Sequence, residues 1–292
     1  MDILFFSLIL AVTGALISFP IQYMFSRMPE AWLQDYDYDP KAKDYRPAKR
    51  MDFFPHTFCV LAFLAVVFFL TSYTNPTYLS GPKVFHLVFA LLPALPLTMV
   101  ILSDMLNRII PDQLTAVAGL ICVFGFMADL MEGSLWIPQG SPWYLFVLNR
   151  VLGGLIGAVL LWGIGFLGSM FSGRESLGFG DVKLLGACGL LSGAYGLTFV
   201  IFIAFVAGGI FAVPLLVRKR IRIHKEELLI IQSENPEETR LKLEAKREAM
   251  AYADDPDYIA FGPFLAIGTI TFLVLETQFY QFFSQLFLVS GM

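Results

Sequence analysis

Gly178-Phe179-Gly180-Asp181-Val182-Lys183 is a short polar stretch that leads into an apolar run of 36 residues, 182–217. A membrane-spanning helix needs about 20 apolar residues, so this run is too long for one span. We therefore predict two spans joined by a bend at residues 193–196, Gly-Ala-Tyr-Gly. Asp181 then lies at a membrane boundary, where an acid is costly unless it has a partner or a function.

The rest of the chain repeats this alternation of apolar runs and polar segments. Of its 292 residues, 57% are hydrophobic and 15% are charged, whereas soluble domains carry about 25% charged residues. The composition and run lengths predict an all-α, polytopic membrane protein with about eight transmembrane helices. The other six runs cover residues 3–25, 55–73, 83–103, 113–130, 144–171 and 261–287. The first lacks a basic leading region and a small-residue cleavage site, which indicates a retained helix rather than a signal peptide.

These runs divide the chain into five parts. Residues 1–25 form the first transmembrane helix, 26–54 a polar segment, 55–217 the membrane core, 218–259 a charged segment and 260–292 the last transmembrane helix. In the charged segment, Asn235-Pro236-Glu237-Glu238 is typical of a helix start.

The basic residues predict which side of the membrane each loop occupies. Four segments on one side, 26–54, 104–112, 172–183 and 218–259, hold 18 of the 20 Lys and Arg residues. Basic residues concentrate in cytoplasmic loops, so these four segments are predicted to be cytoplasmic and both termini periplasmic.

A second acidic stretch, residues 103–112, ends the run 83–103 and contains Asp104 and Asp112. Asp104 and Asp181 both fall at the predicted cytoplasmic ends of spans, which suggests a paired-carboxylate site. Two close carboxyls do not ionise together readily, so one can accept a proton from water while the other donates a hydrogen bond to a scissile carbonyl. The alternatives are that each acid only ends or caps a helix, or that the pair is an ion site of a transporter or scaffold.

Four stretches resemble the type IV prepilin peptidases, a family of G-x-G-D aspartic membrane proteases, and they occur in that family's order. They are Ser18-Phe19 with Arg27-Met28-Pro29, Asp104 with Ile110-Pro111-Asp112-Gln113-Leu114-Thr115, the run Glu175–Leu185 with Gly-Phe-Gly-Asp, and Phe261-Gly262-Pro263-Phe264-Leu265-Ala266. Another kind of G-x-G-D protease, the presenilin type, would carry Pro-Ala-Leu near the last span, where this chain has Phe261-Gly262-Pro263.

The resemblance implies a catalytic pair of Asp104 and Asp181. Asp112 is the alternative first acid, although capping the fourth span suits it as well. Lys183 could tune the pair, bind an acidic part of a substrate or simply anchor the helix in the cytoplasm. Residues that could approach the substrate or shape the site are Gly178, Gly180, Phe261, Gly262 and Pro263.

The resemblance also implies substrates and a location. The family removes a short basic leader from type IV prepilins or type II secretion pseudopilins at the cytoplasmic face of the bacterial inner membrane. Its second activity methylates the new N-terminus with S-adenosylmethionine, but no glycine-rich nucleotide loop supports this independently. Nothing in the net charge of −4 suggests a nucleic-acid partner.

The chain departs from the family in two segments. Many members carry two CxxC pairs that bind zinc after the first span, but Cys59, Cys122 and Cys188 form no such pair, so zinc is not expected. Segment 218–259 is longer than the family's usual connection; it could dock a pilus or secretion component or be a charged surface helix without a partner.

Overall fold

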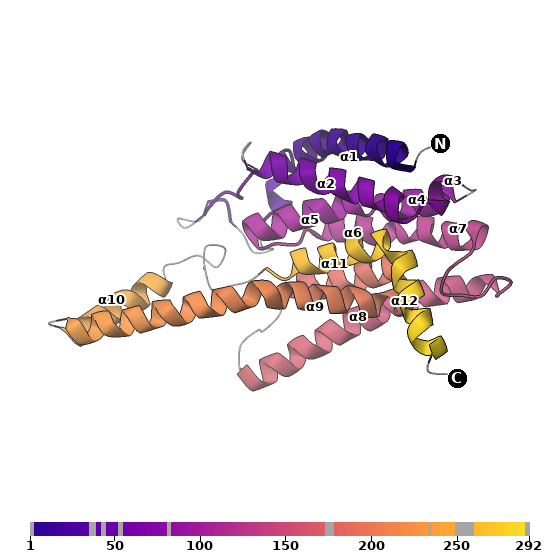
Figure 1. Ribbon diagram of the computed structural model, residues 1–292. Helices are drawn as coiled ribbons and strands as arrows, with labels where there is room; N and C mark the ends of the chain where they lie inside the picture. Colours follow the sequence, from indigo (N-terminus) through magenta and orange to yellow (C-terminus); the bar gives the residue numbers. More distant parts are fainter. Residues whose placement is uncertain are drawn as a thin grey trace.

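The computed structural model describes residues 3–34, 39–41, 45–51, 55–80, 83–172, 178–233, 235–248 and 260–289. Every regular element in these ranges is helical, as predicted, and most helices run side by side (Figure 1). The helices are α1 (Ile3–Ser26), the 3₁₀ helix η1 (Glu30–Trp32), α2 (His56–Thr74), α3 (Thr77–Ser80), α4 (Val84–Leu91), α5 (Ala94–Asn107), α6 (Asp112–Leu120), α7 (Cys122–Glu132), α8 (Trp143–Ser172), α9 (Phe179–Gln232), α10 (Pro236–Glu248), α11 (Gly262–Val274) and α12 (Glu276–Val289).

Six helical stretches of the described residues are long and apolar enough to cross a membrane, or seven if the bent pair α11–α12 is one span. Two of the six are broken helices, α4 with α5 and α6 with α7. The sequence predicts eight spans, one more than the structural count of seven. The difference is α9, which is one helix in the structural count but two spans in the prediction.

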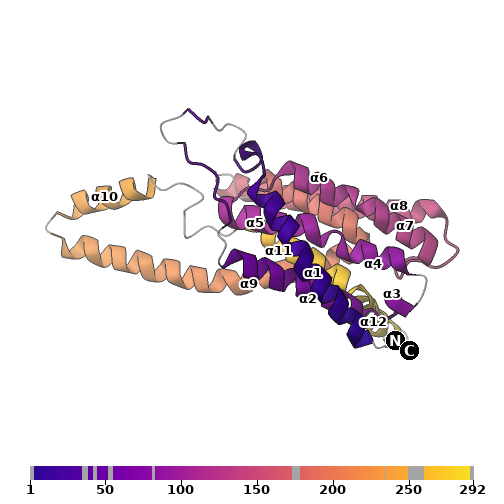
Figure 2. The same ribbon diagram turned by 90° about the horizontal axis from the view of Figure 1, so that it is seen from above.

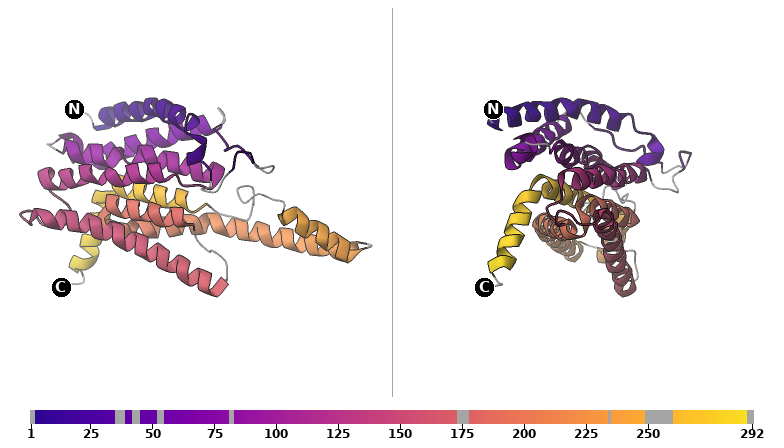
Figure 3. Two further views of the ribbon diagram at one scale, coloured as in Figure 1. Left: turned by 180° about the vertical axis from the view of Figure 1, so that it is seen from behind. Right: turned by 90° about the vertical axis from the view of Figure 1, so that its right-hand side faces the viewer.

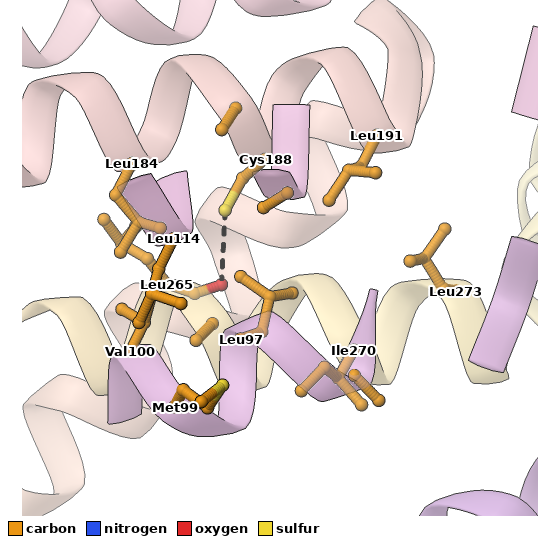
Figure 4. Close-up of a cluster of buried hydrophobic side chains, with 14 of the residues drawn as sticks. Leu97, Met99, Val100, Leu114, Leu184, Cys188, Leu191, Leu265, Ile270 and Leu273 are labelled. Carbon is orange, nitrogen blue, oxygen red and sulfur yellow. Dashed lines mark hydrogen bonds between the residues drawn. The ribbon is translucent and has the colours of Figure 1, made fainter. Parts of the chain in front are cut away.

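The bend predicted at residues 193–196 is present in α9. Gly193 has the non-helical angles φ 70° and ψ 173°, and Asn149 Oδ1 accepts the N–H of Ala194 there at 3.0 Å. The two limbs on either side run in opposite directions along α11. In the first limb, Cys188 lies against Leu265 (Figure 4). In the second, Gly196 approaches Phe272 whereas Gly208 approaches Phe261.

The first limb of α9 packs closely against α8 because glycines face each other in both helices. A Cβ at Gly153 would overlap the backbone of residues 189–194, and one at Gly157 would lie 2.7 Å from the carbonyl oxygen of Leu185. Small residues at a helix interface let the two backbones approach closely, and Gly153 and Gly157 do so here.

The run 261–287, predicted as the last span, is not one straight helix. α11 and α12 meet at a bend of 76°, and α12 turns away from the bundle (Figure 3). Asn75, the C-cap residue of α2, explains the break: its Nδ2 donates to Val274 O at 2.8 Å, and its Oδ1 accepts the hydroxyl of Thr277 at 2.6 Å. Gln278 also donates to Thr74 O at 2.7 Å. Asn75 thus satisfies a carbonyl that the break leaves unpaired, and Gln278 satisfies the last carbonyl of α2.

The apolar core lies where α5, the first limb of α9 and α11 meet. Side chains from all three helices point toward one another there, with Leu97 and Leu184 0% exposed and Leu265 1% exposed (Figure 4). Because interiors are close-packed, this core fixes the three helices relative to one another.

The second limb of α9 continues beyond the bundle, and α10 lies beside it (Figure 2). The helix predicted to start at residues 235–238 is therefore present as α10. Several apolar side chains of this extension are exposed, among them Leu229 and Ile231.

Candidate active site

Asp104 lies in the last turn of α5 and is only 5% exposed. The helix ends at Asn107, and its C-cap residue Arg108 has a left-handed backbone (φ 59°, ψ 32°) and donates its N–H to Asp104 O at 3.0 Å. The hydroxyl of Ser103 donates to Ile109 O at 2.7 Å, and the chain then turns into α6. These contacts fix the backbone that carries the Asp104 carboxylate.

The N-terminus of α11 meets the Asp104 carboxylate directly. The N–H of Gly262 donates a hydrogen bond to it, and the Arg108 charge is also close enough to act on it. A Cβ at position 262 would lie 2.6 Å from Asp104 Oδ2, so the approach requires glycine. Pro263 follows in the first turn, where its missing N–H costs nothing. Asp104 therefore lies at the positive end of the α11 dipole.

Asp181 lies in the first turn of α9 and is half-buried. Its N–H donates to Gly178 O at 3.1 Å, and its carboxylate interacts electrostatically with that of Asp104. Ile110 separates the two helix starts: a Cβ at Gly180 would lie 3.3 Å from Ile110 Cβ, and one at Gly262 would lie 2.9 Å from Ile110 Cδ1. The structure therefore brings the two predicted aspartates together.

Each aspartate has one buried oxygen without a hydrogen-bond partner among the described residues. These atoms are Oδ2 of Asp104 and Oδ1 of Asp181. Buried polar atoms in folded proteins are nearly always hydrogen-bonded, so two such atoms on adjacent carboxyls indicate a site kept ready for another molecule.

Lys183 and Asp112 form an ion pair with each other. The Lys183 Nζ lies 2.8 Å and 2.7 Å from the two Asp112 carboxylate oxygens, and 5.1 Å from the Phe179 ring centroid. The expectation that Asp112 caps the fourth span is wrong in detail, because Pro111 is the N-cap residue of α6 and no side chain caps it. The pair instead ties the start of α6 to the start of α9.

The remaining predicted residues surround the aspartates. Phe261 packs its ring against Phe205 of the second α9 limb, with centroids 5.6 Å apart, and is the N-cap residue of α11. Gly178 is the N-cap residue of α9, and a Cβ there would lie 3.5 Å from Asp181 Oδ2. Glu175 of the motif lies outside the described residues.

Arg108 and Asn107 lie near the site and were not singled out from the sequence, whereas Ile110 was named only as part of the aspartate motif and was given no role. The apolar residue before Pro111 in the aspartate motif is the signal that could have found Ile110. No group of three or more His, Cys, Asp or Glu side chains in the described part of the chain could hold a metal ion.

Residues 90–213, which include both aspartates, match the profile of the type IV leader peptidase family. This part of the chain is therefore similar to that family. The chain is 31% identical over 179 residues to a prepilin leader peptidase/N-methyltransferase of Burkholderia pseudomallei, a match that covers 61% of this chain and 43% of that relative.

Two further relatives of the leader peptidase family carry the same name. The one from Aeromonas salmonicida is 30% identical over 129 residues, which is 43% of this chain and 40% of the relative. The one from Xanthomonas campestris pv. campestris is 30% identical over 107 residues, which is 37% of this chain and 33% of the relative. The matches thus span less than half of each relative's length, and no solved structure matches the chain.

Proposed function

We propose that the chain is an aspartic endopeptidase that removes the leader of type IV prepilins or type II secretion pseudopilins. The observation that carries this proposal is the meeting of Asp104 and Asp181, each with a buried oxygen that lacks a partner among the described residues. The family of residues 90–213 and the names of the relatives support it.

The surroundings of the two carboxyls suggest a role for each. Burial disfavours the ionised form of both carboxyls, but Asp104 accepts the Gly262 N–H at the positive end of α11 and lies near the Arg108 charge, and these three features favour ionisation of Asp104 over that of Asp181. Asp181 faces the negative charge of Asp104. We infer that Asp104 takes a proton from the attacking water while Asp181 donates a hydrogen bond to the carbonyl oxygen of the scissile peptide.

The reaction then needs only these two groups and one water. Attack of the water forms a tetrahedral intermediate whose oxygen is protonated by Asp181, and Asp104 passes its newly gained proton to the leaving amine. As the intermediate collapses, one of its hydroxyls returns a proton to Asp181, which restores the starting protonation of the pair. The products are the free leader with a new C-terminal carboxyl and a mature pilin with a new N-terminal amine.

The location of the site fits a substrate that is itself a membrane protein. We propose that the chain is in the bacterial inner membrane with the aspartates at the cytoplasmic face, as the distribution of Lys and Arg indicates. A prepilin presents its cleavage site where a basic leader joins an apolar helix, which is the depth of these aspartates. The extension formed by α9 and α10 could contact a pilus or secretion component on that side.

N-methylation of the new N-terminus is a second proposed activity, because the relatives are named N-methyltransferases. A groove of about 310 Å³ on α8 does not fit S-adenosylmethionine. It is lined by Leu155, Ile156, Val159 and Leu160, whose side chains cannot donate or accept a hydrogen bond, whereas the cofactor's amino, carboxylate and ribose groups need polar partners. No residues are therefore assigned to this step.

Cleavage of a model prepilin in membranes tests the proposal. We expect Asp104→Asn and Asp181→Asn to abolish cleavage, and Asp112→Asn to retain it because Asp112 is paired with Lys183. Mass spectrometry of the product N-terminus reads methylation in the same samples as a gain of about 14 Da.

If both asparagine variants still cleave at the native rate, the pair is not catalytic. An ion site in a transporter or scaffold then explains the two acids better, and proton-coupled uptake in vesicles would be the measurement to make. Cleavage within the apolar helix rather than at the leader junction would favour another kind of G-x-G-D protease.

A further inference from the structure

The segment that follows α1 is held together by one carboxylate, that of Glu30. Its Oε1 accepts hydrogen bonds from the backbone N–H of Ala48, the hydroxyl of Tyr45 (3.2 Å) and the amide of Gln34 (3.1 Å). Its Oε2 accepts one from the Arg50 guanidinium at 2.9 Å. We call Glu30 and these four partners the Glu30 cluster. Charge-assisted hydrogen bonds are the stronger kind, so one ionised group joins the two ends of the segment.

Arg50 also joins the Glu30 cluster to the end of α1. Its NH1 group donates to Met28 O at 2.8 Å and lies 3.5 Å from Phe25 O. Carbonyls at a helix C-terminus lack intrahelical partners, so a cationic side chain placed there fixes how the chain leaves the helix. The Phe25 side chain is 0% exposed, which anchors this end of α1 in the core.

The same segment reaches the candidate active site through Asn107. The N–H of Lys49 donates to Asn107 Oδ1 at 2.7 Å, and Asn107 Nδ2 donates to Lys49 O at 3.2 Å. Asn107 is 9% exposed and ends α5, three residues after Asp104. The two neighbours of Lys49 in the chain belong to the Glu30 cluster, so the cluster sets the position of the residue that binds the end of α5.

We propose that Glu30 is a positioning residue for Asp104: through Lys49 and Asn107 its cluster holds the last turn of α5 against the N-terminus of α11. The kinetic test of this proposal, prepilin cleavage, rests on the proposed peptidase function. A second test, the alkylation of a cysteine at position 104, does not depend on that function. Residues 45–51 would then be held in place by hydrogen bonds, in the segment where the resemblance implies that many family members bind zinc.

The kinetic test substitutes Glu30→Gln, which keeps the size of the side chain but loses one oxygen that accepts from Arg50. We expect kcat for prepilin cleavage to fall about ten- to hundredfold, with KM changed less than twofold, because a misplaced catalytic group slows the chemical step. Glu237→Gln, an exposed glutamate of α10, is the matched control and should cleave as the native chain does.

The route through Asn107 is tested by a double-mutant cycle. Asn107→Leu should lower kcat to a similar extent, and the combination with Glu30→Gln should be no slower than the slower single variant, since both break one chain of contacts. If Glu30→Gln lowers only the melting temperature and leaves kcat native well below it, Glu30 is structural and the proposal is wrong. Additive losses would also contradict the route.

A second readout does not depend on peptidase activity. In a chain whose three native cysteines are replaced by alanine, Asp104→Cys places a thiol where exposure is only 5% in the native chain. We expect N-ethylmaleimide to alkylate this thiol about tenfold faster when Glu30→Gln is added, but not when Glu237→Gln is added. An unchanged alkylation rate would overturn the proposal for Glu30. If the native chain cleaves no prepilin, that result contradicts only the proposed peptidase function, and the alkylation test still decides the role of Glu30.

Discussion

Buried charged side chains have hydrogen-bonding partners at one end of the helix bundle, whereas at the other end two carboxylates have oxygens that lack them among the described residues. At the end where α7 finishes and α8 begins, Asp129 receives two hydrogen bonds from Arg150, and Glu132 receives the backbone N–H groups of Phe85 and His86. At the other end, Asp104 and Asp181 each keep a buried oxygen without a partner among the described residues. A buried charge with a partner is compensated, whereas one without a partner costs stability and indicates a site with another purpose.

Removing the Arg150 charge that pairs with Asp129 should produce the largest loss of stability. Arg150 is 8% exposed, binds Asp129 and Leu191 O, and lies 4.7 Å from the Phe89 ring centroid. Arg150→Met leaves Asp129 buried without its cation, so we expect the free energy of unfolding to fall by about 3–5 kcal/mol. Thermal unfolding in detergent measures the loss.

The double variant Arg150→Met with Asp129→Leu is the control for that prediction, because it removes both charges together. It should recover most of the lost stability. A double variant as unstable as the single one would show that the pair matters for packing rather than for charge.

Adding a side-chain atom at Gly262, beside the Asp104 carboxylate, should reduce activity more than stability. A Cβ at Gly262 would lie 2.6 Å from Asp104 Oδ2 and must displace the carboxylate. We expect Gly262→Ala to lower kcat about a hundredfold and the free energy of unfolding by about 1–3 kcal/mol. Gly163→Ala is the matched control, since a Cβ there meets nothing within 4 Å. Native kcat in Gly262→Ala would contradict the geometry described for Asp104.

The Glu30 cluster adds a pH dependence to this end of the molecule. Partial burial acts to raise the pKa of Glu30, but hydrogen bonds from Ala48, Gln34 and Tyr45 and the Arg50 charge outweigh it and hold the pKa below its usual value. Its contribution to stability is therefore complete above the unfolded-state pKa, about 4.3, and is lost as pH falls through the lower folded-state value.

We expect the melting temperature of Glu30→Gln to lie below that of the native chain by a constant margin from about pH 8 to about pH 5. The corresponding loss in the free energy of unfolding is about 1–2 kcal/mol. The two melting curves should converge as pH falls below about 4. A margin that stays the same at acidic pH would show that the carboxylate charge plays no part in the cluster.

The smallest effect is expected at the pair of Lys183 and Asp112, whose side chains are 31% and 43% exposed. Ion pairs this accessible contribute about 0–1 kcal/mol, so Lys183→Met should change the melting temperature little and kcat less than about threefold. A large loss of kcat measured with the prepilin substrate would mean that Lys183 acts on the aspartates or on the substrate, as the sequence alone allowed.

Local patterns in the sequence predicted most of the helices but not every bend. Residues 193–196 carry two glycines, and the predicted bend is present at Gly193. The bend after Val274 has no such signal, because it depends on hydrogen bonds from Asn75, about 200 residues earlier. A helix break caused by tertiary contacts leaves an apolar run unchanged.

The candidate site follows the same division. Asp104 and Asp181 could be chosen from the sequence because each interrupts an apolar run and belongs to a recognisable motif. The pairing of Lys183 with Asp112 and the contacts of Glu30 join residues that are distant in the chain and share no motif. Only the packing of the helices brings them together.

The most direct test of the account measures melting temperature and prepilin cleavage on the same purified samples of Asp104→Asn and Asp181→Asn. If the unpartnered aspartates serve catalysis rather than stability, cleavage falls about a thousandfold or more while the melting temperature is unchanged or rises. A sharp fall in melting temperature with cleavage retained would contradict the account, because these aspartates would then be structural like those at the opposite end.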